Sequence, residues 1–195
     1  MSGEGRQSDR ERWDERYAIL EPERRNNPTP FVTACLPHLP QRGLALDVAA
    51  GNGRHSVLLA EHGLWVDAID ISWYGLRKAM ERAARHGMAI HPIVLDIQQG
   101  WLPDRQYDVV VNSFFLLRDL IPAIKAVIKP DGWLVFETFT IHQLEITPHR
   151  FRTQDHLLAP GEALRLFADF HIVQYWEGEE NNKATARLLA CRRFC

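Results

Sequence analysis

Small residues and a carboxylate alternate in one stretch of the chain that has the composition of a ligand-binding loop. Asp47 is followed at every second position by Ala49, Gly51 and Gly53. Because glycine has no Cβ atom, the backbone at these positions can bend tightly and approach a ligand closely. A helix that starts just after the loop would add unpaired N–H groups and the positive end of its dipole. The spacing therefore predicts a nucleotide-type binding loop.

Two more carboxylates occur where strands are expected to end. Asp70 comes nineteen residues after Gly51, at the end of one apolar run, and Asp96 with Ile97 follows another. In open α/β sheets, ligands bind at the carboxyl ends of the strands. A carboxylate there can accept hydrogen bonds from both hydroxyls of a ribose. The alternatives are a helix cap or solvated carboxylate at Asp70, and a turn-forming side chain at Asp96.

The elements that must position these residues are alternating strands and helices. Leu44–Val48 is an apolar run typical of a central parallel strand, and Arg54–Glu61 has the apolar spacing of a helix. Lys129-Pro-Asp-Gly132 is predicted to be a turn. The remaining predicted elements are helices at 11–20, 31–39, 72–86, 116–128 and 161–168, and strands at 64–69, 89–95, 107–112, 133–139, 170–176 and 184–192.

The glycine spacing alone leaves two classes of nucleotide enzyme open. A Gly-x-Gly-x-x-Gly fingerprint placed at Gly51 gives Gly51, Gly53 and Ser56, with Asp70 as the ribose ligand. An NAD(P)-dependent oxidoreductase of Rossmann type is therefore one alternative. The predicted C-terminal hairpin disfavours it, since the dinucleotide fold would continue with a helix and a parallel strand.

The acidic strand end and its glycine loop resemble motif I of the class I S-adenosylmethionine (SAM) methyltransferases, with Ala49 in place of the first glycine. The resemblance covers most of the chain and is greatest to the small tellurite-resistance and thiopurine-type methyltransferases. Its other features are Trp13-Asp-Glu-Arg-Tyr17, the strand-end residues Asp70 and Asp96, and Lys-Pro-Asp-Gly132 before a late strand.

This resemblance implies an α/β fold, a Rossmann-like doubly wound sheet of seven strands in the order 3-2-1-4-5-7-6. The sheet would be mostly parallel with an antiparallel C-terminal strand. It also implies SAM as cofactor, S-adenosylhomocysteine as product, and methyl transfer to a small-molecule acceptor by in-line displacement. The predicted cofactor-binding residues are Trp13, Arg16, Tyr17, Asp47, Ala49, Gly51, Gly53, Asp70, Ile71, Asp96, Ile97 and Asn112. Among these, Asp70 is assigned to the ribose, and Asp96 with Ile97 to the adenine.

A single domain is expected from 195 residues with 46% hydrophobic residues. Residues 1–10 are polar and predicted to be a disordered tail, and 11–195 to be the methyltransferase domain, with 11–40 as an N-terminal arm. Trp13 and Tyr17 share one face of the arm helix, being four residues apart. In the families it resembles, the arm closes over SAM, so Arg16 would meet the SAM carboxylate. The alternative is a helix that only packs on the domain.

Composition excludes several kinds of partner and site. The formal net charge of −2 gives no support for a general nucleic-acid binder, whose affinity would rest on clustered Lys and Arg, and no apolar run approaches the roughly 18 residues of a membrane span. Asn112-Ser-Phe-Phe115 lacks both prolines of the amino methyltransferases that act on DNA bases. Pro148 interrupts the spaced histidines at 142, 149 and 156, so no metal site is expected. Three cysteines without scaffold spacing suggest a cytoplasmic protein, which we expect to be a monomer or weak homodimer.

The expected chemistry needs little from the protein beyond aligning the acceptor with the methyl carbon and sulfur of SAM. Such alignment can lower the activation barrier by up to about 7 to 11 kcal/mol. Soft anions such as thiolates attack a sulfonium methyl group without help, whereas a neutral hydroxyl would need a proton acceptor. No catalytic residue is identified from the sequence. Candidates for lining the acceptor pocket are Phe115, Arg118 and His142. A SAM-binding partner protein without turnover is the third alternative.

Overall fold

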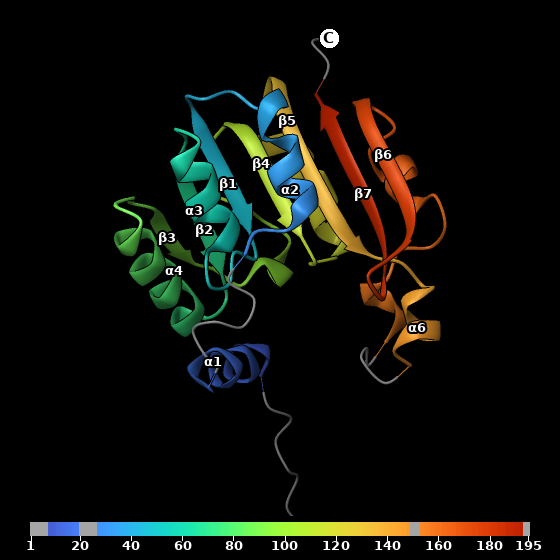
Figure 1. Ribbon diagram of the computed structural model, residues 1–195, viewed down its shortest axis with the longest axis horizontal. Helices are drawn as coiled ribbons and strands as arrows, with labels where there is room; N and C mark the ends of the chain where they lie inside the picture. Colours follow the sequence, from blue (N-terminus) through green and yellow to red (C-terminus); the bar gives the residue numbers. More distant parts are fainter. Residues whose placement is uncertain (1–7, 20–26, 149–152, 193–195) are drawn as a thin grey trace, which may run out of the picture.

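The computed structural model describes residues 8–19, 27–148 and 153–192. Its centre is a seven-stranded sheet in the order β3-β2-β1-β4-β5-β7-β6 (Figure 1). The first five strands pair in parallel, and β7 runs antiparallel to both of its neighbours. The strands are β1 Leu44–Val48, β2 Trp65–Asp70, β3 His91–Val94, β4 Tyr107–Ser113, β5 Ile128–Phe139, β6 His171–Glu180 and β7 Lys183–Cys191. The predicted fold class and strand order are confirmed.

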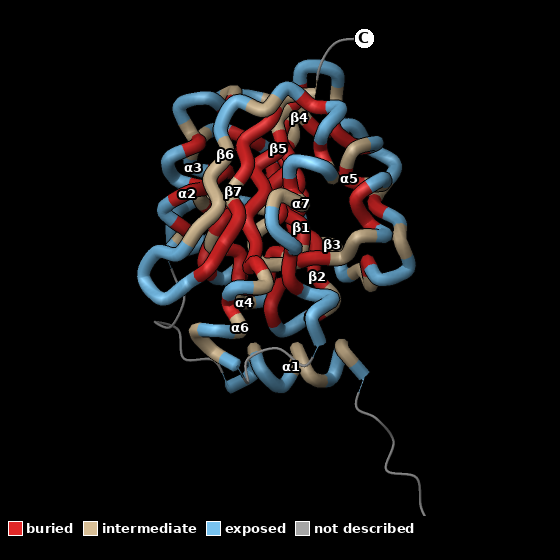
Figure 2. The backbone as a smooth tube through the Cα atoms, turned by 90° about the vertical axis from the view of Figure 1, so that its right-hand side faces the viewer, coloured by how far each residue is buried: buried red, intermediate tan, exposed pale blue. Residues whose placement is uncertain are grey.

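Helices cover both faces of this sheet, and the buried residues concentrate in the sheet between them (Figure 2). One face packs against α2, α3 and α4, the other against α5 and α7. Burial on both faces explains why β1 and β4 are continuous apolar runs. The helices are α1 Asp9–Ile19, α2 Pro30–Cys35, α3 Arg54–Glu61, α4 Trp73–Arg85, α5 Ile121–Val127, α6 Gln143–Ile146 and α7 Glu162–Leu166, with 3-10 turns at Leu36–His38, Ile97–Gln99, Arg118–Leu120 and Gln154–His156.

The predicted turn at Lys129-Pro-Asp-Gly132 is wrong, because β5 already begins at Ile128. Ile128 pairs with Tyr107 and Trp133 with Val109, so four residues bulge out between these pairs. Asp131 takes up the bend with φ 60, and its N–H donates to Arg192 O at 2.9 Å. The stretch is therefore an irregularity within the strand, stabilised by the end of the chain's last strand.

Several other predicted boundaries also differ from the structure. The helix predicted from residue 116 begins as a 3-10 turn and becomes α5 only at Ile121, because Pro122 suits a helix start. The loop predicted at 177–183 shrinks to a two-residue turn at Asn181 and Asn182, which both adopt positive φ. β3 is shorter than predicted, with four residues.

The first helix, α1, lies apart from the sheet, below the carboxyl ends of its parallel strands (Figure 1). It begins at Asp9, two residues before the predicted start, and none of its residues is buried. Of the predicted tail at residues 1–10, residues 1–7 lie outside the described residues, and Asp9 and Arg10 belong to α1. No helix in the described part of the chain combines the length and apolar character that crossing a membrane requires.

Candidate active site

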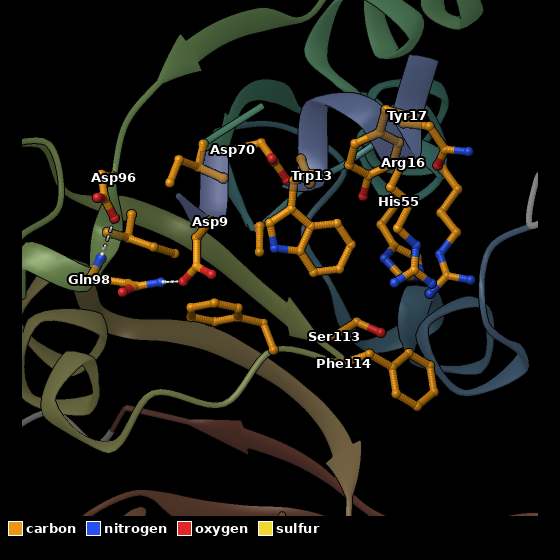
Figure 3. Close-up of a pocket in the computed structure, with 17 residues that line it drawn as sticks. Asp9, Trp13, Arg16, Tyr17, His55, Asp70, Asp96, Gln98, Ser113 and Phe114 are labelled. Carbon is orange, nitrogen blue, oxygen red and sulfur yellow. Dashed lines mark hydrogen bonds between the residues drawn. The ribbon is translucent and has the colours of Figure 1, made fainter. Parts of the chain in front are cut away.

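A cleft opens between α1 and the carboxyl ends of β1, β2 and β4 (Figure 3). Its position is where open α/β sheets bind ligands. The residues that line it are Asp9, Trp13, Arg16, Tyr17, Ala49, Ala50, Asn52, Arg54, His55, Asp70, Ile71, Asp96, Ile97, Gln98, Ser113, Phe114 and Phe115. Eight of the twelve predicted cofactor-binding residues are among them.

The loop after β1 has the tight left-handed backbone that its small residues predict. Ala49, Gly51 and Gly53 have φ values of 55, 57 and 72. A Cβ atom on Gly51 would collide with the hydroxyl group of Tyr17, which reaches down from α1. A Cβ atom on Gly53 would collide with Ala79 of α4. The absence of a side chain at Gly51 therefore lets Tyr17 of α1 contact the loop. The absence of a side chain at Gly53 lets the start of α3 pack closely against α4.

Ala49 is strained, because an alanine with positive φ costs roughly 1–2 kcal/mol relative to the right-handed region. We expect Ala49→Gly to stabilise the protein by up to about 1 kcal/mol, after the larger unfolded-state entropy of glycine is subtracted. Chemical denaturation should show this increase, with little change in ligand affinity. A destabilised variant would mean that the Ala49 methyl group makes packing contacts worth more than the strain.

Asp47 lies behind the loop instead of lining the cleft. It is 1% exposed, and the Ser56 hydroxyl group donates to its Oδ2 at 2.6 Å. Burial raises the pKa of Asp47 to about 7. The predicted direct contact of Asp47 with the cofactor does not fit this position. Its carboxylate instead ties the start of α3 to the end of β1.

Asp70 lines the cleft and also holds the loop. Its Oδ2 accepts the Gly51 N–H and its Oδ1 accepts the Ser72 N–H, both at 2.8 Å. A carboxylate has about four acceptor sites, so two remain for ligand hydroxyl groups. Burial, with a smaller contribution from the nearby Asp14 carboxylate, raises the pKa of Asp70 to about 6, against the backbone N–H groups of Ser72, Gly51 and Ile71, which favour the charged form.

Because Asp70 becomes protonated below about pH 6, it loses acceptor capacity there. We expect S-adenosylhomocysteine affinity to fall as the pH is lowered from 7 to 5. Asp70→Asn should weaken binding at pH 8 by about 1.5–3 kcal/mol, the range for hydrogen bonds to charged groups. It should also flatten this part of the pH profile. Calorimetry across the range tests both, and an unchanged slope in Asp70→Asn would assign the titration to Asp47, whose pKa burial raises to about 7.

Asp96 and Ile97 form the far end of the cleft. Asp96 Oδ1 accepts the Gln98 N–H at 3.1 Å, so the side chain also caps the 3-10 turn that follows. The Gln98 amide in turn donates to the Asp9 carboxylate of α1 (Figure 3). This end of the cleft is therefore rich in carboxylates and suits the amino and hydroxyl groups of a nucleoside.

Helix α1 places its aromatic face over the cleft, as the spacing predicts. The Trp13 and Tyr17 rings stack with centroids 5.8 Å apart, and the Arg16 guanidinium lies 4.9 Å from the Trp13 ring centroid. Asp14 Oδ1 accepts the Ser72 hydroxyl group at 2.5 Å. Together with the bond between Asp9 and Gln98, this contact fastens α1 to the ends of β2 and β3.

The structure adds lining residues that sequence reasoning missed. Arg54 and His55 belong to the first turn of α3, and their position directly after the glycine loop was an available signal. Ser113 is the last residue of β4, and Phe114 follows it. Phe114 has φ 57, and the Arg54 guanidinium lies 5.8 Å from its ring centroid. Backbone strain of this kind cannot be read from local sequence.

Two predicted acceptor-pocket residues lie elsewhere. Arg118 donates to both oxygens of Glu162, at 2.7 and 2.8 Å, and to the carbonyls of Asp155 and Leu157, so it anchors the segment before α7. His142 lies at a separate recess beside β6 and β7. Phe115 does line the cleft.

Asn112 is also misplaced by the prediction. It is 1% exposed, is not among the residues lining the cleft, and its Oδ1 is buried without a hydrogen-bond partner in the described structure. Within the described residues, no group of three or more His, Cys, Asp or Glu side chains is placed to hold a metal ion.

The polar residues of the cleft are segregated by charge (Figure 3). Asp9 and Asp96 lie at one end, and Arg16 and His55 lie at the other. Arg54, which directly precedes His55 at the start of α3, also lines the cleft. A ligand with a nucleoside at one end and an anionic group at the other matches this arrangement. SAM has both, so the charge distribution of the cleft fits this cofactor.

The sequence matches a known family over the segment that builds the cleft. Residues 45–132 match the family described as "Methyltransferase domain". The chain is 32% identical over 131 residues to a candidate methyltransferase named YqeM from Bacillus subtilis (strain 168). The alignment covers 60% of this chain and 51% of YqeM, so the chain spans about half the length of that curated relative.

Solved structures show the same fold. TehB from Haemophilus influenzae is 20% identical with a TM-score of 0.70, covering 83% of this chain and 61% of TehB. Magnesium protoporphyrin IX methyltransferase (ChlM) from Synechocystis PCC 6803 with bound SAH is 17% identical with a TM-score of 0.68, covering 97% of this chain and 90% of ChlM.

These matches agree on a segment and a fold. Residues 45–132 match the methyltransferase-domain family. The seven-stranded sheet with its antiparallel β7 is the fold shared with the solved methyltransferase structures.

Proposed function

We propose that the protein transfers the methyl group of SAM to a small-molecule acceptor. The observation that carries this proposal is the cleft itself, because it collects the glycine loop, Asp70, Asp96 and the aromatic face of α1 at the carboxyl edge of the sheet. The sulfonium of bound SAM supplies a methyl group that is already electrophilic. The protein then has to bind, orient and exclude water.

The proposed roles of the lining residues follow from their positions. Asp70 accepts the ribose hydroxyls with the acceptor sites that Gly51 and Ser72 leave free. Asp96 with Ile97 holds the adenine. Trp13 and Tyr17 cover the ligand and keep water from the reacting atoms. The acceptor approaches from the end of β4, where Ser113, Phe114 and Phe115 line the cleft.

The acceptor side offers aromatic surface and cations. Phe114 packs on Phe139 with ring centroids 4.6 Å apart, and the Lys183 ammonium lies 5.7 Å from the Phe114 ring centroid. Alignment alone suffices for a soft nucleophile such as a thiolate. We therefore assign no general base, and the acceptor atom is the property that the experiment below must identify.

The nicotinamide alternative is disfavoured by the fold and the loop. The antiparallel β7 departs from the dinucleotide-binding topology. Ser56 occupies the third fingerprint position, where its hydroxyl group bonds to Asp47. The non-catalytic SAM-binding alternative predicts the same ligand without turnover, so only an activity measurement separates it.

The test has two stages. Calorimetry with SAM, S-adenosylhomocysteine, NAD and NADP should show binding of the first two only. Transfer of labelled methyl groups from SAM to thiols, tellurite, phenols and amines should then show turnover with one acceptor class. Binding of NAD or NADP in place of SAM would refute the proposal, and SAM binding without turnover across the panel would favour the non-catalytic role.

We also propose a single-domain protein that acts in the cytoplasm as a monomer or weak homodimer. The free thiols of Cys35 and Cys191 support a reducing compartment. Sedimentation at several protein concentrations measures the association state.

A further inference from the structure

His55 is a buried histidine that the roles above leave unexplained. It lies in the first turn of α3, is 4% exposed, and lines the cleft. Its Nε2 accepts a hydrogen bond from the Thr29 backbone N–H at 3.2 Å. Thr29 is flanked by Pro28 and Pro30, which have no N–H groups, so this triplet offers a single backbone donor and directs it to the His55 ring.

This hydrogen bond determines which nitrogen of the ring carries the proton. Because Nε2 accepts from a backbone N–H, it is unprotonated, and the neutral ring carries its hydrogen on Nδ1. Burial, together with the smaller effect of the Arg54 and Arg82 charges, lowers the pKa of His55 to about 3. His55 is thus held as a neutral side chain with a single N–H donor.

The position of His55 indicates what this donor meets. In Figure 3 it lies between Arg16 and Tyr17 of α1 on one side and Ser113 on the other, far from Asp96 and Gln98. This is the cationic end of the cleft. The anionic group of SAM is the carboxylate of its amino-acid portion, which the charge distribution directs to this end.

We propose that His55 binds the SAM carboxylate by donating a hydrogen bond from Nδ1–H, with Thr29 holding the ring in the required orientation. The inference rests on SAM being the cofactor. A neutral donor here adds directional recognition without placing a buried positive charge next to Arg54. The Pro28-Thr29-Pro30 triplet then has two roles: it begins α2, and it orients His55 for cofactor binding.

Two substitutions of His55 test the roles of its two ring nitrogens separately. His55→Asn keeps an N–H donor near the position of Nδ1, while His55→Gln keeps an acceptor for Thr29 near the position of Nε2. The probes are S-adenosylhomocysteine and 5′-methylthioadenosine, which has the nucleoside and sulfur but no carboxylate. We expect His55→Gln to weaken S-adenosylhomocysteine binding about tenfold or more and to leave 5′-methylthioadenosine unchanged. His55→Asn keeps the donor but loses the Thr29 contact that orients it, so it should bind S-adenosylhomocysteine more tightly than His55→Gln does and bind 5′-methylthioadenosine unchanged.

A second measurement uses the unsubstituted protein. The ring Nδ1 proton of His55 should shift in NMR spectra on adding S-adenosylhomocysteine but not 5′-methylthioadenosine. Equal losses for both probes in His55→Gln, or no selective proton shift, would overturn the His55 assignment and leave SAM as cofactor. If neither probe bound the unsubstituted protein, the proposed function would fail, and this inference with it.

Discussion

Gly51→Val should abolish binding of S-adenosylhomocysteine while the protein stays folded. The Gly51 backbone has φ 57, which β-branched residues rarely adopt, and a Cβ atom there would collide with the Tyr17 hydroxyl group. Tyr17 can swing away, since it belongs to the exposed helix α1. The added side chain would still project toward α1 and the cleft. Calorimetry with S-adenosylhomocysteine measures the loss.

Gly87 provides the matched control for this substitution. It has φ 70, and a Cβ atom there would have no heavy atom within 4 Å. Gly87→Val therefore imposes similar backbone strain at the end of α4 without filling the cleft. It should lower the free energy of unfolding but keep ligand affinity. If Gly51→Val bound S-adenosylhomocysteine as tightly as Gly87→Val does, the site would not be at this loop.

Deleting residues 1–20 should weaken cofactor binding and remove turnover while the sheet domain stays folded. None of the α1 residues is buried, so little core packing is lost. The deletion would, however, remove the lining residues Trp13, Arg16 and Tyr17 from one wall of the cleft. Removing the cover also lets water reach the reacting atoms. Calorimetry, methyl-transfer assays and thermal unfolding without ligand measure the three effects.

Point substitutions test whether the contacts of α1 matter beyond its presence. Asp14→Ala removes the hydrogen bond to the Ser72 hydroxyl group but leaves the aromatic face intact. It should weaken binding less than the deletion does. Hydrogen exchange at 11–19 should slow on adding S-adenosylhomocysteine. If the ligand did not change hydrogen exchange at 11–19, and the deletion of residues 1–20 did not change ligand affinity, α1 would be only a packing helix.

The sequence alone was sufficient for the elements whose signals are local. The apolar run predicts the bounds of β1, because a strand buried on both faces needs apolar residues at successive positions. The helical spacing predicts the bounds of α3, because a helix buried on one face needs apolar residues every three or four positions. The Ser72 cap, whose Oγ accepts the Gly75 N–H at 3.1 Å, likewise acts over three residues. The strand order came from family resemblance, since pairing between distant strands has no such local signal.

Much of the candidate site was also predictable, for a topological reason. Residues at the carboxyl ends of neighbouring parallel strands must converge at one edge of the sheet, so Asp70 and Asp96 line the same cleft as Ala49 of the glycine loop. What such reasoning does not provide is the direction of each side chain. Asp47 and Asn112 also lie near strand ends, yet both are buried away from the cleft.

Only the tertiary structure decided the roles that depend on contacts between distant segments. Thr29 and His55 are 26 residues apart, and their hydrogen bond fixes the histidine tautomer. Arg118 and Glu162 are 44 residues apart, and their ion pair makes Arg118 an anchor instead of an acceptor ligand. The sequence around His55 and Arg118 does not predict these partners, because a side chain takes its orientation and protonation from the groups that surround it after folding.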